Sequence, residues 1–569
     1  MTATSPSFLE TLKRKVVVID GAMGTSIHAH DLDLERDFAG LENCCEIVNA
    51  RRPDVIRSIH ASFLAAGCDA VETNTFGAMP HVLREFDLAE RCAEINAAAV
   101  RAAREACEQF STPDRPRFVL GSMGPGTKLA TLGQITYAEL KASYAEQALA
   151  LARAGVDGFA IETVQDPLQA KAAVNACLAA RREVGRELAL MVSVTMEVTG
   201  TMLVGTEMAA AIALLDPYPI DVLAINCATG PREMSTHVRL LGQTWRRAIG
   251  CYPNAGLPLL VDGQPHYPLT PAELADWLLR FVEEDGLALV GGCCGTTPEH
   301  LAAVVRALEG RAPKKRKPAF QPQVTSLYHA VDLRQESSIL LVGERSNANG
   351  SRQFKEHLLA GQLDPIVEMG KEQLREGSHA LDLCVAYVGR DETADMEAAV
   401  KRYRTEVAAP LSIDTTEVPV LKAALELLGA RSIVNSINLE DGLERVSKVL
   451  PLAKEHGSAL IALTIDEEGM AKSVEDKVRI ARRIHDLAVQ DHGLRSEDLL
   501  FDVLTFTVCT GNEDDRKHAM NTLEGVKRVR EELPGVGTLL GVSNVSFGLK
   551  PAARHALNSV FLHHAQEAG

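Results

Sequence analysis

The sequence lacks any apolar run near the 18 or more residues that a membrane span needs. Residues 1–15 also lack the apolar core of a secretory signal. Basic residues are too few for a nucleic-acid footprint, because 59 Lys and Arg face 76 Asp and Glu, for a net charge of −17. We therefore expect a cytoplasmic protein with no membrane and no nucleic acid among its partners.

Regular cysteine spacing is absent as well. The 12 cysteines follow no disulfide framework, which predicts reduced thiols in a cytoplasm. Three of them stand where apolar, strand-like runs end: Cys227 follows residues 223–226, and Cys293 and Cys294 follow 287–290. Ligands gather at the carboxyl ends of strands in α/β folds, and three thiolates can hold a tetrahedral zinc while leaving one position open. This arrangement is typical of a catalytic zinc site.

Two other interpretations of these cysteines remain open. A buried cysteine commonly packs as a small apolar residue, and adjacent cysteines sometimes form a strained disulfide. A second adjacent pair, Cys44 and Cys45, has no strand before it, and we expect it to have no function.

The first 310 residues alternate between strand-like and helix-like segments. The eight strand-like segments are residues 16–19, 70–76, 118–123, 158–163, 188–195, 223–226, 259–262 and 287–290. Eight such units predict a (β/α)8 barrel of the TIM type over residues 1–310, with a doubly wound open sheet as the alternative.

All strands of such a barrel end at one mouth, so the polar residues at their ends should share one site. These residues are Asp20, Thr73, Asn74, Glu162, Cys227, Cys293 and Cys294. Glu162 is suited to pair with the ammonium of an amino acid, or alternatively to form an ion pair that closes the mouth. The backbone amides of Gly21 and Ala22 are suited to bind the carboxylate of the same amino-acid ligand. Asn254, expected before the seventh strand, is either a possible fourth zinc ligand or a turn residue.

Four motifs in this half resemble the homocysteine S-methyltransferase family. They are Asp-Gly-Ala-Met-Gly-Thr at 20–25, Glu-Thr-Asn-Thr-Phe at 72–76, Asn-Cys at 226–227 and Gly-Gly-Cys-Cys-Gly-Thr at 291–296. The resemblance implies a zinc held by Cys227, Cys293 and Cys294, with the sulfur of homocysteine as fourth ligand. It also implies that this half methylates homocysteine to methionine.

A basic, proline-rich stretch follows, and we expect residues 311–330 to be a linker.

Alternation of strand-like and helix-like segments resumes over residues 331–569, where each strand-like segment ends in Asp, Asn or Glu. A ring of carboxylates and amides at these strand ends is suited to bind a neutral heterocycle with amide and amino edges. Binding of Mg²⁺ is the main alternative. Glycine-rich or basic phosphate sites are missing. The predicted ring is Glu344, Asn347, Asp382, Asp414, Asn435, Asp466, Asp502 and Asn544.

Motifs in this second half resemble the pterin-binding methyltransferase family. They include Gly-Glu-Arg-Ser-Asn at 343–347, Asn-Ser-Ile-Asn at 435–438 and Gly-Val-Ser-Asn-Val-Ser-Phe-Gly at 541–548. The resemblance implies that Asp414, Asn435, Asp502 and Asn544 contact the pterin ring of methyltetrahydrofolate. Cys384 departs from the family, which often has Asn there. Only seven strands are expected, so this barrel lacks its last β/α unit, as in a fragment or a chain completed by another.

The two halves in this order resemble the amino-terminal half of the cobalamin-dependent methionine synthase family. The resemblance implies methyl transfer from methyltetrahydrofolate through cobalamin to homocysteine, with Cys227, Cys293, Cys294 and Asn544 in the chemistry. Asp-x-His-x-x-Gly, the cobalt-ligating pattern of that family, is missing from the sequence, so we expect a cobalamin-binding domain or protein as partner. A cobalamin-independent enzyme using S-methylmethionine or betaine, and a non-catalytic folate- or zinc-binding protein, remain as alternatives.

Overall fold

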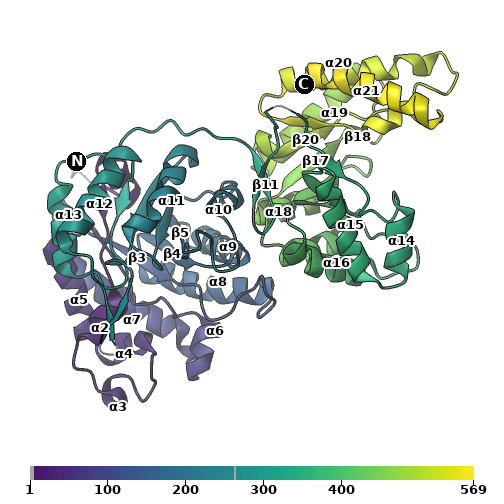
Figure 1. Cartoon of the computed structure of the whole chain (residues 1–569). Coiled ribbons are helices and arrows are strands. Elements are labelled where there is room, and N and C mark those ends of the chain that lie inside the picture. The colour runs from purple at the N-terminus through teal and green to yellow at the C-terminus, as the bar shows by residue number, and fades with distance from the viewer. Residues whose placement is uncertain (1–5, 262–263, 337) are drawn as a thin grey trace. The chain divides into compact units, whose positions relative to one another are not determined.

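Alternating strands and helices build two units, Met1–Phe320 and Gln321–Gly569, in the computed structural model (Figure 1). The structure describes residues 6–261, 264–336 and 338–569. Each unit has its own apolar core. None of the described helices is long and apolar enough to cross a membrane.

The first unit is a closed ring of eight parallel strands. The strand order is β1-β10-β7-β6-β5-β4-β3-β2, and a parallel bridge between Ile19 and Ala70 joins the two ends of that order. The strands are β1 (Val17–Val18), β2 (Ala70–Glu72), β3 (Phe118–Met123), β4 (Gly158–Val164), β5 (Ala189–Val194), β6 (Val222–Asn226), β7 (Ala248–Tyr252) and β10 (Leu289–Val290). The predicted (β/α)8 barrel is therefore confirmed for this unit.

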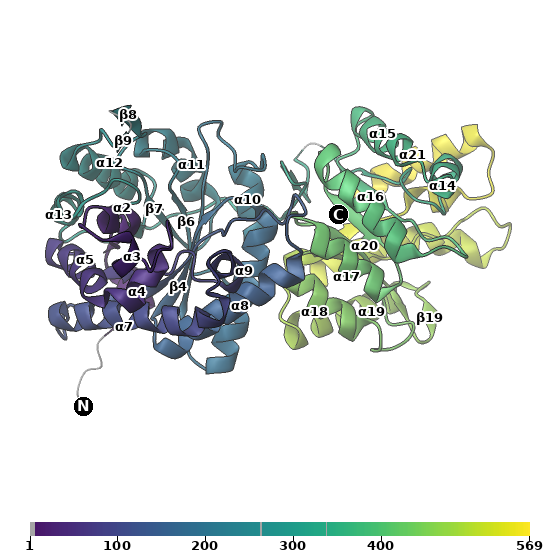
Figure 2. The same cartoon turned by 90° about the horizontal axis from the view of Figure 1, so that it is seen from below.

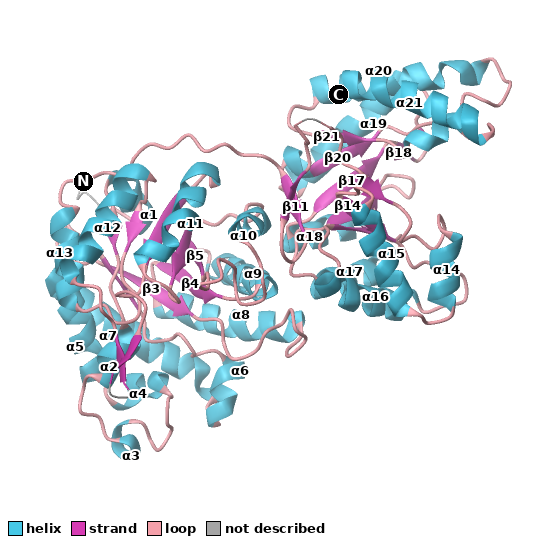
Figure 3. Ribbon diagram, in the orientation of Figure 1, coloured by secondary structure: helices cyan, strands magenta, loops and turns pink. Residues whose placement is uncertain are grey.

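Helices surround these strands, as Figure 3 shows in cyan around magenta. Their starts follow local rules: Thr136 and Glu139 form a capping box at α8, and proline occupies the first turn of α5, α9, α11, α12 and α13. The main helices are α5 (Pro53–Ala66), α7 (Cys92–Phe110), α8 (Tyr137–Ala154), α9 (Pro167–Val184), α10 (Met208–Leu215), α11 (Pro231–Thr244), α12 (Pro271–Glu284) and α13 (Pro298–Ala307).

The seventh strand differs from the prediction. The barrel strand is β7, whereas β8 (Leu259–Val261) pairs antiparallel with β9 (Gln264–His266) in a hairpin apart from the barrel sheet. Leu260 is 81% exposed, so this apolar run is not core. Asp262, which the prediction placed at the end of this strand, lies outside the described residues. As a consequence, Asn254 follows the seventh strand instead of preceding it.

The second unit contains seven parallel strands in the order β13-β14-β15-β16-β17-β20-β21. They are β13 (Val342–Gly343), β14 (Ala380–Leu383), β15 (Leu411–Asp414), β16 (Ile433–Ile437), β17 (Ala459–Leu463), β20 (Leu499–Asp502) and β21 (Gly537–Leu539). The expected number of seven is confirmed, and no described strand pairs with the free edges of β13 and β21.

Helices flank this sheet too, and most carry labels in Figure 2. They are α14 (Arg352–Leu359), α15 (Leu363–Arg375), α16 (Glu392–Glu406), α17 (Val418–Leu427), α18 (Val446–His456), α19 (Val474–Asp486), α20 (His518–Glu532) and α21 (Pro551–Ala568).

Three local features of the second unit differ from the expected elements. The seventh strand ends at Leu539, and Asn544 lies in a 3-10 helix, Val542–Ser546. Asp466 belongs to a small hairpin of β18 (Ile465–Asp466) and β19 (Gly469–Met470). Part of the predicted linker forms an antiparallel pair, β11 (Gln323–Thr325) with β12 (Ala330–Asp332).

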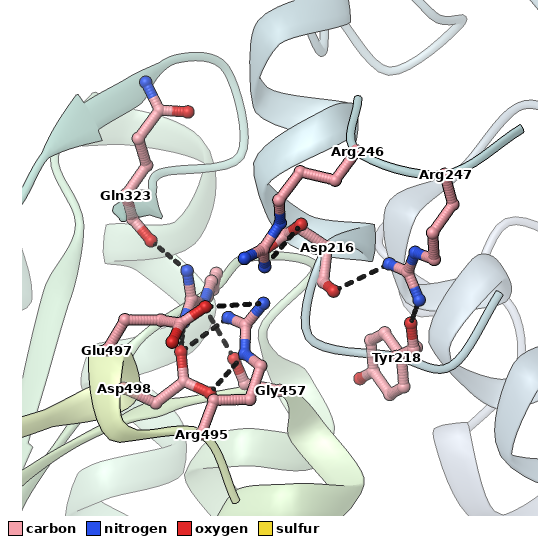
Figure 4. A network of polar contacts seen from close by, with 10 residues as sticks. Asp216, Tyr218, Arg246, Arg247, Gln323, Gly457, Arg495, Glu497 and Asp498 are labelled. Atoms are coloured by element: carbon pink, nitrogen blue, oxygen red, sulfur yellow. Dashed lines mark hydrogen bonds and ion pairs between the residues drawn. The ribbon is translucent and has the colours of Figure 1, made fainter. Parts of the chain in front are cut away.

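A buried ion cluster ties the start of the second unit to its sheet (Figure 4). The Arg431 guanidinium, 1% exposed, donates hydrogen bonds to the carbonyl oxygens of Gly457 (2.9 Å) and Gln323, and it pairs with the Asp498 carboxylate. Arg495 donates to the same carboxylate at 2.6 and 2.8 Å. Each buried charge thus has an opposite charge and hydrogen bonds, which burial requires.

Candidate active site

Three thiols meet at the carboxyl ends of β6 and β10. The Sγ atoms of Cys227, Cys293 and Cys294 all lie within 4.8 Å of one another, and those of Cys227 and Cys294 are 3.9 Å apart. Hydrogen bonds from Cys227 and Cys293 lower the pKa of the Cys294 thiol, so the cluster already favours one thiolate. The three cysteines singled out from the sequence are therefore neighbours, whereas Cys44 and Cys45 join no such group among the described residues.

Close backbone packing explains the glycines around the adjacent cysteines. A Cβ on Gly292 would lie 2.4 Å from the Thr296 hydroxyl oxygen, and one on Gly295 would lie 2.2 Å from the Tyr267 ring. The Thr296 hydroxyl donates to the Cys293 carbonyl at 2.7 Å and accepts from the Ala22 amide at 3.3 Å. Only glycine leaves room for this turn, which holds both thiols beside the loop after β1.

Asn226 orients the thiol cluster, a role that the sequence did not reveal. Its Oδ1 accepts from the Thr163 amide (3.0 Å) and the Ser193 hydroxyl (2.7 Å), and its Nδ2 donates to the Thr163 hydroxyl (2.9 Å) and to Cys293 Sγ (3.8 Å). The side chain is fully buried. It therefore links β4 and β5 to Cys293 through four hydrogen bonds.

We expect Asn226→Ala to lower zinc affinity about 10- to 100-fold, because partners that orient a metal ligand typically contribute that much. Competition with a chromophoric chelator measures the affinity. Asn175→Ala, on the exterior helix α9, is the control and should leave it unchanged. Equal zinc affinity in wild type and Asn226→Ala would show that the amide does not orient Cys293.

Asn254 is occupied by a backbone contact. Its Oδ1 accepts a hydrogen bond from the Cys294 amide at 3.1 Å, and the side chain is 3% exposed. The contact stabilises the turn of the adjacent cysteines. Its service as a fourth zinc ligand stays a prediction.

The predicted homocysteine-binding residues divide into two groups. Asp20 and Glu162 are buried in the barrel: the Asp20 carboxylate accepts from the Glu72 amide at 3.1 and 3.2 Å, and Glu162 accepts from the Ser122 hydroxyl. Burial raises the pKa of Glu162 to about 7. No described Lys or Arg forms an ion pair with Glu162, so the alternative of a mouth-closing ion pair finds no support.

Thr73 and Asn74 are engaged in the barrel wall. The Thr73 hydroxyl is 2.6 Å from that of Thr75, and the Asn74 Nδ2 donates to the Cys45 carbonyl (2.9 Å) and to Asn49 Oδ1 (3.0 Å). These side chains brace the loop after β2. A direct contact with homocysteine stays a prediction for both.

Four residues of the predicted pterin ring form one hydrogen-bonded cluster. Asp382 accepts from Asn347 Nδ2 (3.0 Å), from Asn435 Nδ2 (3.1 Å) and from the Ser412 hydroxyl (2.9 Å), while Asp414 accepts from Asn347 at 3.1 Å. Burial, with the charge of Asp382, raises the pKa of Asp414 to about 6. The cluster joins the carboxyl ends of β14, β15 and β16.

The other predicted ring residues lie in different settings. Burial raises the pKa of Asp502 to about 6 and also raises that of Glu344. Asp466 of the hairpin pairs with Arg479 on α19 at 2.8 Å, and Asn544 is exposed, with no side-chain hydrogen bond from a described residue. Neither Asp466 nor Asn544 joins the cluster around Asp382. Their contact with a pterin stays a prediction.

Cys384, the position that departs from the family pattern, also lies in this cluster. It is 3% exposed, and its Sγ accepts from Asn349 Nδ2 at 3.6 Å. Burial raises its pKa to about 12. The thiol is therefore a protonated, weakly polar neighbour of Asp414.

The first unit is thus a closed (β/α)8 barrel with three cysteine thiols at its mouth, and the second is a seven-stranded parallel sheet whose strand ends carry carboxylates and amides. Residues 17–308, just over half of the chain, match the model of the homocysteine S-methyltransferase family, and residues 343–569 match that of the pterin binding enzymes. The chain belongs to the homocysteine S-methyltransferase family.

Curated relatives are similar to the chain along its whole length. A methionine synthase of Mycobacterium tuberculosis is 47% identical over 564 residues, which are 99% of this chain and 47% of that protein. A methionine synthase of Mycobacterium leprae is also 47% identical, with the same shares covered. The chain therefore spans about half the length of these relatives.

Among solved structures, the oxidized form of the homocysteine methyltransferase MmuM from Escherichia coli is similar to part of the chain. It is 24% identical, with a TM-score of 0.43, over 52% of this chain and 96% of that one.

Proposed function

We propose that the first unit binds and activates homocysteine and that the second binds 5-methyltetrahydrofolate. The methyl group then passes through a cobalamin carrier to homocysteine, giving methionine and tetrahydrofolate. The three clustered thiols in the family's barrel carry this proposal. The pterin-binding match of the second unit and the name of the similar mycobacterial proteins support it.

The donor set fits zinc. Three sulfur ligands converge on one point at the mouth of a barrel, and the Asn226 amide contacts one of them. Cys227, Cys293 and Cys294 would hold the ion, which when bound acts as a Lewis acid that stabilises a substrate thiolate at neutral pH.

The chain's own groups would bind the rest of homocysteine. We propose that the Glu162 carboxylate holds the substrate ammonium and that backbone amides of the loop at Gly21 and Ala22 receive its carboxylate. Asp20 fixes the end of β2 through the Glu72 amide. Such fixed contacts place the sulfur for attack on a methyl group, which converts binding energy into orientation.

In the second unit we propose that carboxylates and amides hold the pterin ring and assist proton delivery to N5. A methyl group leaves methyltetrahydrofolate poorly unless N5 is protonated, because the leaving group is otherwise a nitrogen anion. Asp414 and Asp502, with pKa values raised to about 6, and Asn435 are placed for donor and acceptor contacts. Asn544 would reach the ring from its exposed helix.

A cobalamin-binding domain or protein is the proposed partner. All 12 cysteines are free, which is consistent with a reducing compartment such as the cytoplasm. Turnover of homocysteine tests the proposal: the zinc-loaded chain should form methionine from free methylcobalamin and none from S-methylmethionine or betaine. Methylation by those two donors alone would instead select a cobalamin-independent enzyme, and ligand binding without turnover a non-catalytic protein.

A substitution in the pterin site should separate function from stability. We expect Asp502→Asn to weaken methyltetrahydrofolate binding about 10- to 100-fold, as loss of a buried charged contact does. The same change should stabilise the second unit at pH 7 by about 1 kcal/mol or more. The folded-state pKa of Asp502 is raised from 3.8 to about 6. Burial of the charged carboxylate therefore lowers the stability of the folded state above pH 6. Acidification from pH 6 towards 4 protonates the group and removes this loss of stability.

Calorimetric titration and denaturant melts at pH 5 and pH 7 measure both effects. The stabilisation by Asp502→Asn should shrink at pH 5. Glu468→Gln, at an exposed position of the β18–β19 hairpin, is the control and should change neither quantity. A destabilised Asp502→Asn protein that still binds the folate would contradict the assignment.

A further inference from the structure

Three carboxyl groups lie at the carboxyl ends of β1, β2 and β4 in the first barrel. Asp20 and Glu162 are 1% and 7% exposed. Glu72, which the sequence analysis did not single out as a ligand, has a buried Oε1 with no hydrogen-bond partner in the described chain. The Asp20 carboxylate accepts from the Glu72 amide at 3.1 and 3.2 Å. Burial, together with the charges of Glu162 and Asp20, raises the pKa of Glu72 well above its usual range.

Positive charge near these carboxyl groups is scarce. No Lys or Arg of the described residues forms an ion pair with any of the three. His60, fully buried on α5, has its Nδ1 at 3.9 Å from Asp20 Oδ2. Buried carboxylates normally have a cation or several donors, because an unpaired buried charge is costly. The buried Oε1 of Glu72 therefore needs a cation beside it, or the carboxyl group must be protonated.

Tyr252 supplies a second and independent observation. Its side chain at the end of β7 is 0% exposed, and its hydroxyl has no hydrogen-bond partner among the described residues. The Ser193 hydroxyl near it donates to Asn226 instead, at 2.7 Å. Glu72 and Glu162 are the charged groups that act most strongly on this hydroxyl. Tyr252 belongs to the core cluster of the barrel that also contains Ala70 and Ala160. Glu72 and Glu162 lie two residues further along the same faces of β2 and β4, so the phenol and the two glutamates face the barrel interior.

The missing partner is more suitably an organic cation than a metal ion. Among the described residues, only two groups bring three ligand atoms within 4.8 Å of one another, and the carboxyl groups of Asp20, Glu72 and Glu162 are not one of them. Their spacing is therefore too wide for one small ion. A primary ammonium group offers three N–H donors that point in different directions, one for each of two carboxylates and one for a phenol oxygen.

We propose that Glu72 and Tyr252 are specificity-determining residues that, with Glu162, enclose the ammonium group of the amino-acid substrate in the first barrel. The inference rests on the proposed homocysteine site and extends it by two contacts. It implies selection of α-amino thiols over thiols that lack the amino group. The proposed contact also gives a reason for a buried, unpaired carboxyl group at Glu72, which lowers the stability of the ligand-free protein.

The test compares two ligands that differ only in the ammonium group. Homocysteine and 4-sulfanylbutanoate share the thiol, the chain length and the carboxylate. Calorimetric titration of the zinc-loaded chain should show that Glu72→Gln weakens homocysteine binding about 10- to 100-fold, as loss of one partner of a buried charge pair does. Binding of 4-sulfanylbutanoate should change less than about threefold. Tyr252→Phe should follow the same pattern with a loss of about three- to tenfold.

Thermal melts of the ligand-free protein separate this role from a structural one. Glu72→Gln should melt at the same temperature as wild type or higher, because it removes a buried, unpaired carboxyl group. Equal losses for both ligands, no loss for homocysteine, or a lowered melting temperature with zinc retained would overturn the proposal.

Wild type and Glu162→Gln distinguish this inference from the function on which it rests. If wild type binds neither ligand, the proposed homocysteine site is wrong. If Glu162→Gln loses the preference for homocysteine while Glu72→Gln and Tyr252→Phe keep it, the homocysteine site stands and only the two added contacts fail.

Discussion

Replacement of Cys293 by serine is expected to lower methylation of homocysteine by at least about 10³-fold and to release zinc. A hydroxyl is a far poorer zinc ligand than a thiolate, and loss of Lewis-acid stabilisation removes several kcal/mol from the transition state. Cys293 is also the cysteine that the Asn226 amide contacts, so the change disturbs that contact as well. Metal analysis after dialysis and initial rates with homocysteine measure the two effects.

The other adjacent pair provides a matched control. Cys45→Ser changes a partly buried cysteine of the same barrel, outside the thiol cluster, and should keep full zinc and near-normal rates. Thermal melting of both variants shows whether the fold survives. Full zinc content and full rates in Cys293→Ser would disprove the assignment of the three cysteines as ligands.

Asp498→Asn is expected to destabilise the second unit by about 3–5 kcal/mol, which is the usual cost of breaking a buried ion pair from one side. Asp498 is 4% exposed and receives both Arg431 and Arg495. Its neutralisation leaves the fully buried Arg431 guanidinium with an amide in place of the Asp498 carboxylate, beside the carbonyl oxygens of Gln323 and Gly457. Arg495 keeps its contact with Glu497 at 3.8 Å.

Denaturant unfolding of the chain, monitored for the second unit, measures this loss. Glu356→Gln breaks the Arg352–Glu356 pair, whose side chains are 88% and 58% exposed, and should cost less than about 0.5 kcal/mol. The first unit should melt unchanged in both variants. A similar, small effect of the two substitutions would mean that the buried cluster contributes no more than a surface pair.

The sequence predicted the strand ends of the site well. The apolar runs that lead to Cys227, Cys293 and Asp414 all form strands of the two parallel sheets, because buried parallel strands need uninterrupted apolar residues. The same rule misplaced the seventh strand of the first unit. Residues 259–261 are more apolar than Ala248–Tyr252, yet they form an exposed hairpin, since tertiary pairing decides which run enters the ring.

Contacts between distant strands were the part that the sequence could not predict. Asn226 became important through hydrogen bonds to Thr163 and Ser193, on strands 63 and 33 residues away. Glu72 and Tyr252 belong to β2 and β7, which are not neighbours in the strand order, so the sequence did not suggest that they share one barrel interior. Conversely, Asp466 and Asn544 satisfied the strand-end pattern, but a hairpin and a 3-10 helix place them away from the cluster around Asp382.

The join between β1 and β10 has a consequence for how the first unit is made. Val17 pairs with Leu289 and Val18 with Val290, so the ring closes between segments from opposite ends of the unit. During synthesis the edge of β1 that pairs with β10 stays unpaired until the last strand has emerged, and pairings of such long sequence separation form slowly. The loop after β1 meets the turn that bears Cys293 and Cys294 only then. The three thiols are thus brought together only late in the life of the nascent chain, after the last strand of this unit has emerged.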